Sequence, residues 1–287
     1  MHLFRKIYLK LIKVFIINSK IEEIYRLICN LVKNSEKKER KKRVPNNLNE
    51  NSFTVYSQSD EDGIIDQIFE KILYKNKFFI EIGVEDGLEC NTTFLLSQGW
   101  TGVWLEGDQK FEKSITNNFQ SCINKDQLKV VFGYLDKNNI NTKIIENSKN
   151  LNPDLLSIDI GLSTFKVLEA INIIKPRLII VEYNPIFGPS KNIVVQENNH
   201  ESENWWNNEF MFGASLKAYE VLLKDYRLVA CSSSGANAFF VHHDEDLSKF
   251  NKPFNSENYF EEEKYYLIDS FKSWHKKRLF KKTTKIK

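Results

Sequence analysis

Apolar segments of strand length alternate with amphipathic segments along most of the chain. A short apolar run between turn signals is typical of a buried strand, whereas apolar residues three and four positions apart predict a helix. The pattern predicts strands at 78–82, 102–105, 128–132, 155–160, 178–183, 227–231 and 238–242, and helices at 60–72, 111–119, 164–173 and 213–224. Regular alternation of this kind gives a parallel sheet with helices on both faces, so we expect an α/β fold. The tight turn at 232–235 predicts that the last two of the seven strands pair antiparallel.

The first two predicted strands and the turn between them have the layout of a nucleotide-binding unit. Gly83 and Gly87 lie in the turn, and glycine lets the backbone turn sharply and approach a ligand closely. Asn91 or Thr92 is suited to cap the next helix, whose free N–H groups would then face the same ligand. The second strand delivers Glu106 roughly 20 residues after Gly87, the spacing at which Rossmann-like folds place a carboxylate against ribose hydroxyls.

The chemistry of the turn indicates which ligand this unit would bind. Dinucleotide folds use the pattern G-x-G-x-x-G, which offers backbone amides to a pyrophosphate. Here two carboxylates, Glu85 and Asp86, occupy the turn, and they would repel a phosphate. S-adenosyl-L-methionine carries a sulfonium and an α-amino group and no phosphate, so it suits an acidic turn. An ordinary strand-turn-helix with solvated acids is the alternative. We expect one cofactor site, formed by Glu81, Gly83, Glu85, Gly87, Glu106 and Asp108.

Two later strands also end in carboxylates, Asp159 and Glu182. Ligands of open α/β sheets bind at the carboxyl edge of the strands, so both acids are candidate catalytic residues. Asp159 is the first candidate for a general base or for positioning an acceptor hydroxyl, and a strand-end acid that caps the next turn is the alternative. Together with Asn184, the two acids offer the oxygen ligands that Mg²⁺ prefers, which makes these three residues a candidate metal site.

The segment at 185–212 has no clear periodicity, and loops of that length are uncommon without a function. We expect it to lie over the site. His200 is a candidate general base near neutral pH, although a lone loop histidine is more often simply exposed. Trp205 and Trp206 are suited either to stack on a sugar face or to pack in the core.

Charge is strongly segregated along the 287 residues, although the formal net charge is only +3. Residues 1–43 hold 13 Lys/Arg and 4 Asp/Glu, a balance of +9, and residues 272–287 hold 8 Lys/Arg and no acid. The part from 44 to 271 carries 20 Lys/Arg and 34 Asp/Glu, a balance of −14. An acidic body repels phosphate, so we expect no nucleic-acid partner.

The amino-terminal segment combines apolar positions at helical spacing with lysines beside them. Its apolar positions include Leu3, Ile7, Leu11, Val14 and Ile17. The segment has no run near the ~20 apolar residues that a membrane span needs and no clean signal-peptide core. Two alternatives remain: a helix that lies on an anionic membrane or a partner, or a helix that caps the domain or contacts another protomer.

We therefore expect three parts: a basic amphipathic extension and linker at 1–50, an α/β domain at 51–245 and a charged carboxy-terminal extension at 246–287. The four cysteines form no C-x-x-C pair, which favours a reducing compartment. We expect a cytoplasmic protein with peripheral contact at the inner face of the membrane through residues 1–43. The sequence leaves the oligomeric state open.

Six blocks occur in a fixed order from about residue 55 to 241: YSQSDEDGIIDQIF, FFIEIGVEDGLECNTTFLLSQGWTGVWLEGD, DLLSIDI, PRLIIVEYN, FGASLKAYEVLL and YRLVACSSSGANAFFV. On these blocks the chain resembles the FkbM-like family of S-adenosylmethionine-dependent methyltransferases. The resemblance implies the Rossmann-like sheet of class I methyltransferases and O-methylation of a sugar, a glycan or a related metabolite. It also implies that Glu81, Gly83 and Gly87 line the methionine end of the cofactor, that Glu106 binds its ribose and that Asp159 lies at the catalytic edge.

One block departs from the family. Relatives commonly continue after the fourth strand with a run similar to DIDGND, whereas here Asp159 is followed by Ile-Gly-Leu-Ser-Thr at 160–164. If the missing acids hold a metal or the acceptor, the protein has an altered substrate, a weakened activity or none. Two alternatives to an O-methyltransferase therefore stay open: a non-catalytic relative that binds the cofactor, and a scaffold at the membrane surface that works through the basic ends.

Overall fold

The computed structural model describes residues 47–195 and 213–264, and in the amino-terminal part residues 20, 31, 34–35, 38–40 and 44. The chain divides into two compact units, Met1–Pro45 and Asn46–Lys287, and every element below belongs to the second. The predicted amphipathic extension, the loop residues 196–212 and the tail from 265 onward lie outside the described residues, so those predictions stay predictions. The predicted domain limits at 50 and 245 also stay predictions.

One seven-stranded sheet forms the centre of the second unit, with strand order β3-β2-β1-β4-β5-β7-β6. Only β7 runs antiparallel, against both β5 and β6. This confirms the predicted α/β class, the number of strands and the antiparallel closing pair. The strands are β1 (Phe78–Ile82), β2 (Thr101–Glu106), β3 (Leu128–Phe132), β4 (Leu155–Ile158), β5 (Leu178–Glu182), β6 (Tyr226–Cys231) and β7 (Asn237–His242).

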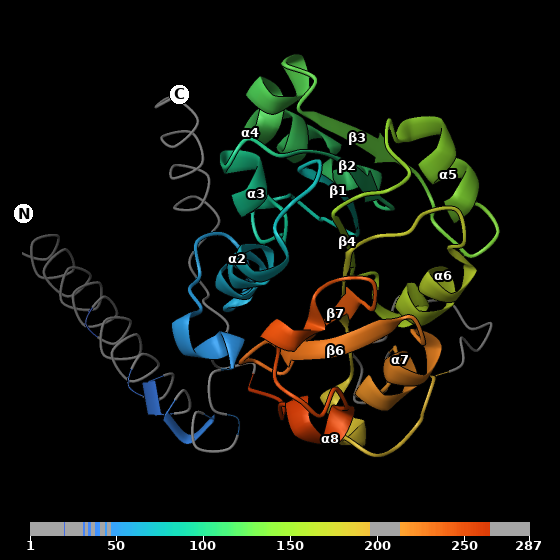
Figure 1. The fold of residues 1–287 in the computed structure, drawn as a ribbon. Coiled ribbons are helices and arrows are strands. Elements are labelled where there is room, and N and C mark those ends of the chain that lie inside the picture. Colours follow the sequence, from blue (N-terminus) through green and yellow to red (C-terminus); the bar gives the residue numbers. More distant parts are fainter. Residues whose placement is uncertain are drawn as a thin grey trace, which may run out of the picture. The chain divides into compact units, whose positions relative to one another are not determined.

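Helices cover both faces of this sheet (Figure 1). Alternate strand residues supply two hydrophobic clusters: Phe79 belongs to one, whereas Phe78, Ile80 and Ile82 belong to the other. The first cluster includes apolar residues of α2 (Glu61–Ile72), α3 (Thr93–Ser97) and α4 (Glu112–Asn124). The second includes those of α5 (Ile140–Asn147), α6 (Thr164–Ala170), α7 (Leu216–Leu222) and α8 (Ser256–Tyr259).

Short 3-10 helices lie in the connections between the main elements and account for several shifted boundaries. They are η1 (Leu48–Asn51), η2 (Gln109–Phe111), η3 (Gly161–Ser163), η4 (Pro185–Phe187) and η6 (Leu247–Lys249). The predicted strand at 155–160 ends at Ile158 because the chain turns into η3 there. The helix α5 was not predicted: only Ile140 and Ile144 of it are buried, and asparagines at 138, 139, 141 and 147 weaken the helical signal.

Residues beyond 245 also pack on the domain. The Tyr183 hydroxyl donates to the Glu261 carbonyl at 2.8 Å, and Lys264 N donates to Ser234 O at 2.8 Å. The described part of the chain contains no helix with the length and apolar character of a membrane span.

Candidate functional site

The tips of β1, β2, β4 and β5 meet at one edge of the sheet, because these strands are parallel and in register there. Ile82 pairs with both Leu105 and Ile158, and Ile158 pairs with Val181. The residues that follow these positions are the predicted acids, Glu106, Asp159 and Glu182, next to the acidic turn after β1. The structure therefore brings together most of the predicted site in what we call the carboxyl edge, which comprises Glu85, Asp86, Glu106, Asp159 and Glu182.

Glu106 ties the turn after β1 to the tip of β2. Its Oε2 accepts from the backbone N–H of Val84 at 2.9 Å and of Glu85 at 2.7 Å, and its Oε1 accepts from Asp108 N at 2.7 Å. These bonds hold Glu85 at a φ of 49°, a left-handed conformation that costs a side chain of this kind about 1 kcal/mol or more. Glu106 is therefore first an organiser of the turn, and its predicted contact with a ribose stays a prediction.

The Glu85 carboxyl lies in a strongly acidic environment. Burial raises its pKa, and the negative charges of Asp159, Asp86 and Glu106 raise it further. The turn therefore concentrates negative charge within reach of the β4 tip, which favours a cationic ligand over a phosphate, as the sequence predicts.

Gly83 and Gly87 are required by their protein neighbours. Both have a positive φ, at 82° and 79°. A Cβ on Gly83 would lie 1.8 Å from the carbonyl oxygen of Asp159, and a Cβ on Gly87 would lie 2.6 Å from ring atoms of Phe119 and Trp104. The turn thus packs directly on the β4 tip and on the core, and its predicted contact with a ligand stays a prediction.

Glu81 is buried and fully engaged at the start of α3. Its carboxylate accepts from Asn91 N at 3.0 Å, from Thr92 N at 3.1 Å and from the Thr92 hydroxyl. Burial raises the pKa of Glu81 to about 7, against the lowering effect of these bonds. The carboxylate of Glu81 takes the two N–H groups directly before α3, those of Asn91 and Thr92, so these two do not face a ligand. The expectation that the free N–H groups of the helix itself face a ligand stays a prediction. Neither Asn91 nor Thr92 caps α3 with its side chain.

Asp108 turns toward its own loop. Its Oδ1 accepts from Lys110 N at 2.9 Å, and its Oδ2 lies 2.5 Å from Lys110 Nζ. The Lys110 hydrogen bonds lower the pKa of Asp108. Because Asp108 is exposed and paired with Lys110, it contributes less negative charge to the carboxyl edge than the acids without a cation do. Its predicted contact with the cofactor stays a prediction.

Asp159 and Glu182 form a carboxyl pair at the β4 and β5 tips, with their side chains within hydrogen-bonding reach of one another. Desolvation raises the pKa of both, and the charge of Asp159 adds to the rise at Glu182. Asp159 is exposed to solvent, whereas Glu182 is half-buried. Two adjacent carboxyls of this kind share one proton more readily than they both ionise.

Asn184, the third predicted metal ligand, caps the 3-10 helix η4. Its Oδ1 accepts from Ile186 N at 3.1 Å, and its backbone N–H donates to Ala214 O at 2.8 Å. One lone pair of the amide oxygen is therefore already in use, and the magnesium site stays a prediction. His200, the remaining catalytic candidate, lies outside the described residues.

Two tyrosines at this edge were missed from the sequence. Tyr134 follows β3 directly, where Gly133 N donates to Glu106 O at 2.9 Å, and 76% of its surface is exposed. The dipeptide Gly133-Tyr134 directly after a predicted strand could have indicated an aromatic side chain at this edge. Tyr219, on α7, is fully buried and its hydroxyl has no hydrogen-bond partner. No sequence signal distinguished it from a core residue of an amphipathic helix.

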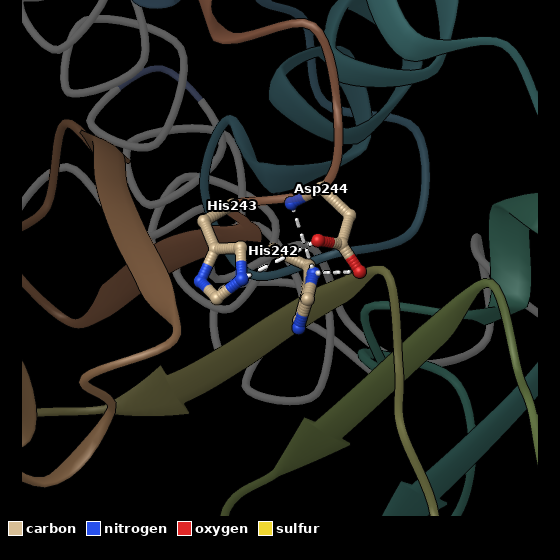
Figure 2. Close-up of side chains that lie close together, drawn as sticks. All are labelled: His242, His243 and Asp244. Carbon is tan, nitrogen blue, oxygen red and sulfur yellow. Dashed lines mark hydrogen bonds and ion pairs between the residues drawn. The ribbon is translucent and has the colours of Figure 1, made fainter.

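His242, His243 and Asp244 form a second cluster, at the opposite edge of the sheet because β7 is antiparallel (Figure 2). One ligand atom from each lies within 4.8 Å of the others. However, His242 Nδ1 accepts from Asp244 N at 3.1 Å, and Lys175 Nζ lies 2.9 Å from Asp244 Oδ2. Burial and the nearby Lys175 charge lower the pKa of His242. Since a proton donor and a cation already occupy these atoms, the cluster is a poor metal site.

No protein-family model and no curated protein matches the chain. Among solved structures, its fold is similar to the N-terminal domain of EvdMO1 with SAH bound, at 11% identity and a TM-score of 0.41, over 72% of this chain and 94% of that chain. An O-methyltransferase from Bacillus cereus in complex with SAH matches at 23% identity and a TM-score of 0.29, over 39% of this chain and 51% of that chain. An RNA methyltransferase from Salinibacter ruber matches at 14% identity and a TM-score of 0.31, over 48% and 94%. These identities and TM-scores are low, so the likenesses concern the fold alone.

Proposed function

We propose that the protein is an S-adenosylmethionine-dependent O-methyltransferase of the FkbM-like type, acting on a hydroxyl of a sugar, a glycan or a related small metabolite. One observation carries the proposal: Glu106 joins the acidic turn after β1 to the β2 tip, and the Asp159–Glu182 pair lies at the same edge. The sheet order, with β7 inserted antiparallel between β5 and β6, provides the scaffold on which this edge is built.

The residues of the carboxyl edge fit the proposed cofactor by charge. Glu85 and Asp86 provide negative charge for a sulfonium and an α-amino group, and the crowded acids would repel a pyrophosphate. Glu106 would hold the ribose and the exposed Tyr134 would cover the base. When bound, the cofactor supplies an electrophilic methyl group on a cationic sulfur.

The chain's own part in the reaction is to align an acceptor and to manage one proton. Methyl transfer is an in-line displacement, so alignment contributes much of the acceleration. The Asp159 carboxylate is accessible to solvent and accepts the proton of the acceptor hydroxyl, while Glu182, which holds the shared proton, keeps Asp159 ionised and oriented.

Calorimetric titration with S-adenosylhomocysteine, the stable product form of the cofactor, tests the proposal. We expect saturable binding that Glu106→Gln weakens about tenfold, because a neutral amide replaces a charged hydrogen-bond acceptor. Glu112→Gln is the matched control, since Glu112 is exposed at the start of α4 and should leave binding unchanged. If millimolar S-adenosylhomocysteine gives no saturable heat with the unaltered protein, the proposal fails.

A non-catalytic relative is the second candidate, and the segment after Asp159 is what favours it. Residues 161–163 form the short helix η3, whose Gly161 N–H bonds to the Asp159 carboxylate, and no further acid follows there. Radiolabelled methyl transfer from S-adenosylmethionine to a panel of mono- and oligosaccharides separates the two. Transfer to any of them excludes the non-catalytic alternative, whereas cofactor binding without any transfer supports it.

A further inference from the structure

The Tyr219 hydroxyl is an exception within the described part of the chain. The residue has 0% exposure, and its Oη is a buried atom without a hydrogen-bond partner. A buried polar group that loses its partner costs about 1–3 kcal/mol. An unpartnered hydroxyl at a candidate site therefore indicates a group that binds there and completes it.

Tyr219 belongs to the carboxyl edge by its position. The Ala214 carbonyl, just before α7, accepts from Asn184 N at 2.8 Å, which fixes the start of α7 to the end of β5. The charges of Glu182 and Asp159 both act on the Tyr219 phenol, yet neither carboxyl accepts a hydrogen bond from it. The hydroxyl and the two carboxyls are thus near neighbours that do not bond one another.

Positive charge is missing from this group of neighbours. Among residues 47–195 and 213–264, no Lys, Arg or His forms an ion pair with Asp159 or Glu182. Two acids held together without a cation are unfavourable unless a proton or a ligand compensates them.

We propose that Asp159, Glu182 and Tyr219 form a recognition site for a protonated primary amine, so that the acceptor is an amino sugar or a similar amino alcohol. This assignment rests on the proposed function, because it names the acceptor of that reaction. An ammonium has three N–H donors, and each of the three side chains offers an oxygen acceptor. An amine bound there places a neighbouring hydroxyl at the β4 tip, where the methyl group would be received.

Other ligand chemistries fit these groups less well. A phosphate or carboxylate on the acceptor would be repelled by the negative charge of the Asp159–Glu182 pair, and a neutral sugar would leave the one charge that remains on the pair without a cation. Magnesium requires near-octahedral oxygen ligands and retains several waters, whereas a neutral phenol is a weak ligand and the Asn184 oxygen already accepts a bond.

The test compares three sugars of matched size and different charge: D-glucosamine, D-glucose and D-glucuronate. Each is titrated into the full-length protein near neutral pH in the presence of EDTA, and binding is followed by ligand-observed NMR. We expect glucosamine to bind at least about tenfold more tightly than glucose, the value of one hydrogen bond to a charged group, and glucuronate to bind most weakly. Equal or tighter binding of glucose overturns the assignment, as does a glucosamine affinity that appears only when Mg²⁺ replaces EDTA.

Two variants with matched controls locate the effect. Glu182→Gln should abolish the preference for glucosamine over glucose, and Tyr219→Phe should reduce it about threefold to tenfold while keeping the shape of the core. The controls are Glu169→Gln, an exposed acid on the neighbouring helix α6, and Tyr74→Phe, an exposed tyrosine before β1. A preference that survives Glu182→Gln overturns the assignment. The parallel titration with S-adenosylhomocysteine needs no sugar, so loss of the proposed function and loss of amine recognition are separate results.

Discussion

The two edges of the sheet differ in whether their acidic side chains are paired with cations. At the amino edge, the guanidinium of Arg177 uses all of its nitrogens: it bonds Asp154 at 2.9 Å, both carboxylate oxygens of Glu245 at 2.7 and 2.8 Å, and two backbone carbonyls, those of Ile72 and Leu73. Asp154 also accepts from the backbone N–H groups of residues 75, 76 and 77. Arg177, Asp154 and Glu245 thus each have a partner of opposite sign.

At the carboxyl edge, Glu85, Glu106, Asp159 and Glu182 form no ion pair with any Lys or Arg of the described ranges 47–195 and 213–264. Backbone N–H groups and shared protons compensate these acids in part. The two edges therefore differ in charge: at one edge ion pairs hold the fold together, and at the other the acids have no cation among the described residues, which is the arrangement that the proposed function requires.

The largest effect is expected from removing the ion pairs of Arg177 at the amino edge. Arg177→Met leaves Asp154 buried without its cation, and we expect a loss of about 3–5 kcal/mol in the free energy of unfolding. Urea denaturation at neutral pH measures it. The matched control is Arg227→Met, because Arg227 donates only to the carbonyls of Lys224 and Tyr226 and its loss leaves no buried acid. Similar losses in both variants would contradict the role assigned to the amino edge.

The next effect is a dependence of stability on pH that differs between the edges. The pKa of Glu81 rises from 4.5 to about 7 on folding, so its contribution is fully present below 4.5 and is lost as pH rises toward 7. The full loss is about 3 kcal/mol at one carboxyl. At the amino edge, hydrogen bonds from Arg177 lower the pKa of Glu245, so that contribution is lost as pH falls below 4.5.

The variant Glu81→Gln isolates the first of these slopes. Glutamine cannot titrate, so the fall in stability between pH 4.5 and 7 should become shallower. The slope that remains comes from the other acids with raised pKa values: Glu61, whose pKa is also about 7 because of burial, and Glu85, Asp159 and Glu182. Denaturation curves at several pH values measure the slope. The glutamine amide bonds less well to Asn91 and Thr92, which lowers stability at every pH but does not change how stability depends on pH. An unchanged slope would mean that Glu81 keeps an ordinary pKa in the folded protein.

How far the sequence predicts the molecule differs between its two edges. The strands were predictable because each is a short apolar run between turn signals, and strand β3 has the predicted limits, 128–132. Glu106, Asp159 and Glu182 were predictable because each lies at the end of a strand, and parallel strands bring their ends together. The ligand chemistry followed from the type of residue in a single turn.

The contacts of Arg177 were not predictable from the sequence, because its partners are Ile72, Leu73, Asp154 and Glu245, and no local pattern joins them. The same is true of Glu81: its position at the end of β1 predicts a ligand contact, whereas its three hydrogen bonds to Asn91 and Thr92 depend on how the loop before α3 folds back. Tyr219 was not predicted as a site residue, because it occupies an apolar position of an amphipathic helix and the sequence does not show that its hydroxyl has no hydrogen-bond partner.

The smallest expected effect concerns cofactor binding and compares two exposed tyrosines, one at each edge of the sheet. Tyr134, after β3, exposes 76% of its surface beside Glu106, and Tyr74, before β1, exposes 53% at the opposite edge. Stacking of a base on an aromatic ring contributes about 1–3 kcal/mol, so Tyr134→Ala should weaken S-adenosylhomocysteine binding about tenfold or more, whereas Tyr134→Phe should retain it. Tyr74→Ala should leave binding unchanged in the same calorimetric titration. If both alanine variants bind equally well, the exposed ring at the carboxyl edge has no part in holding the cofactor.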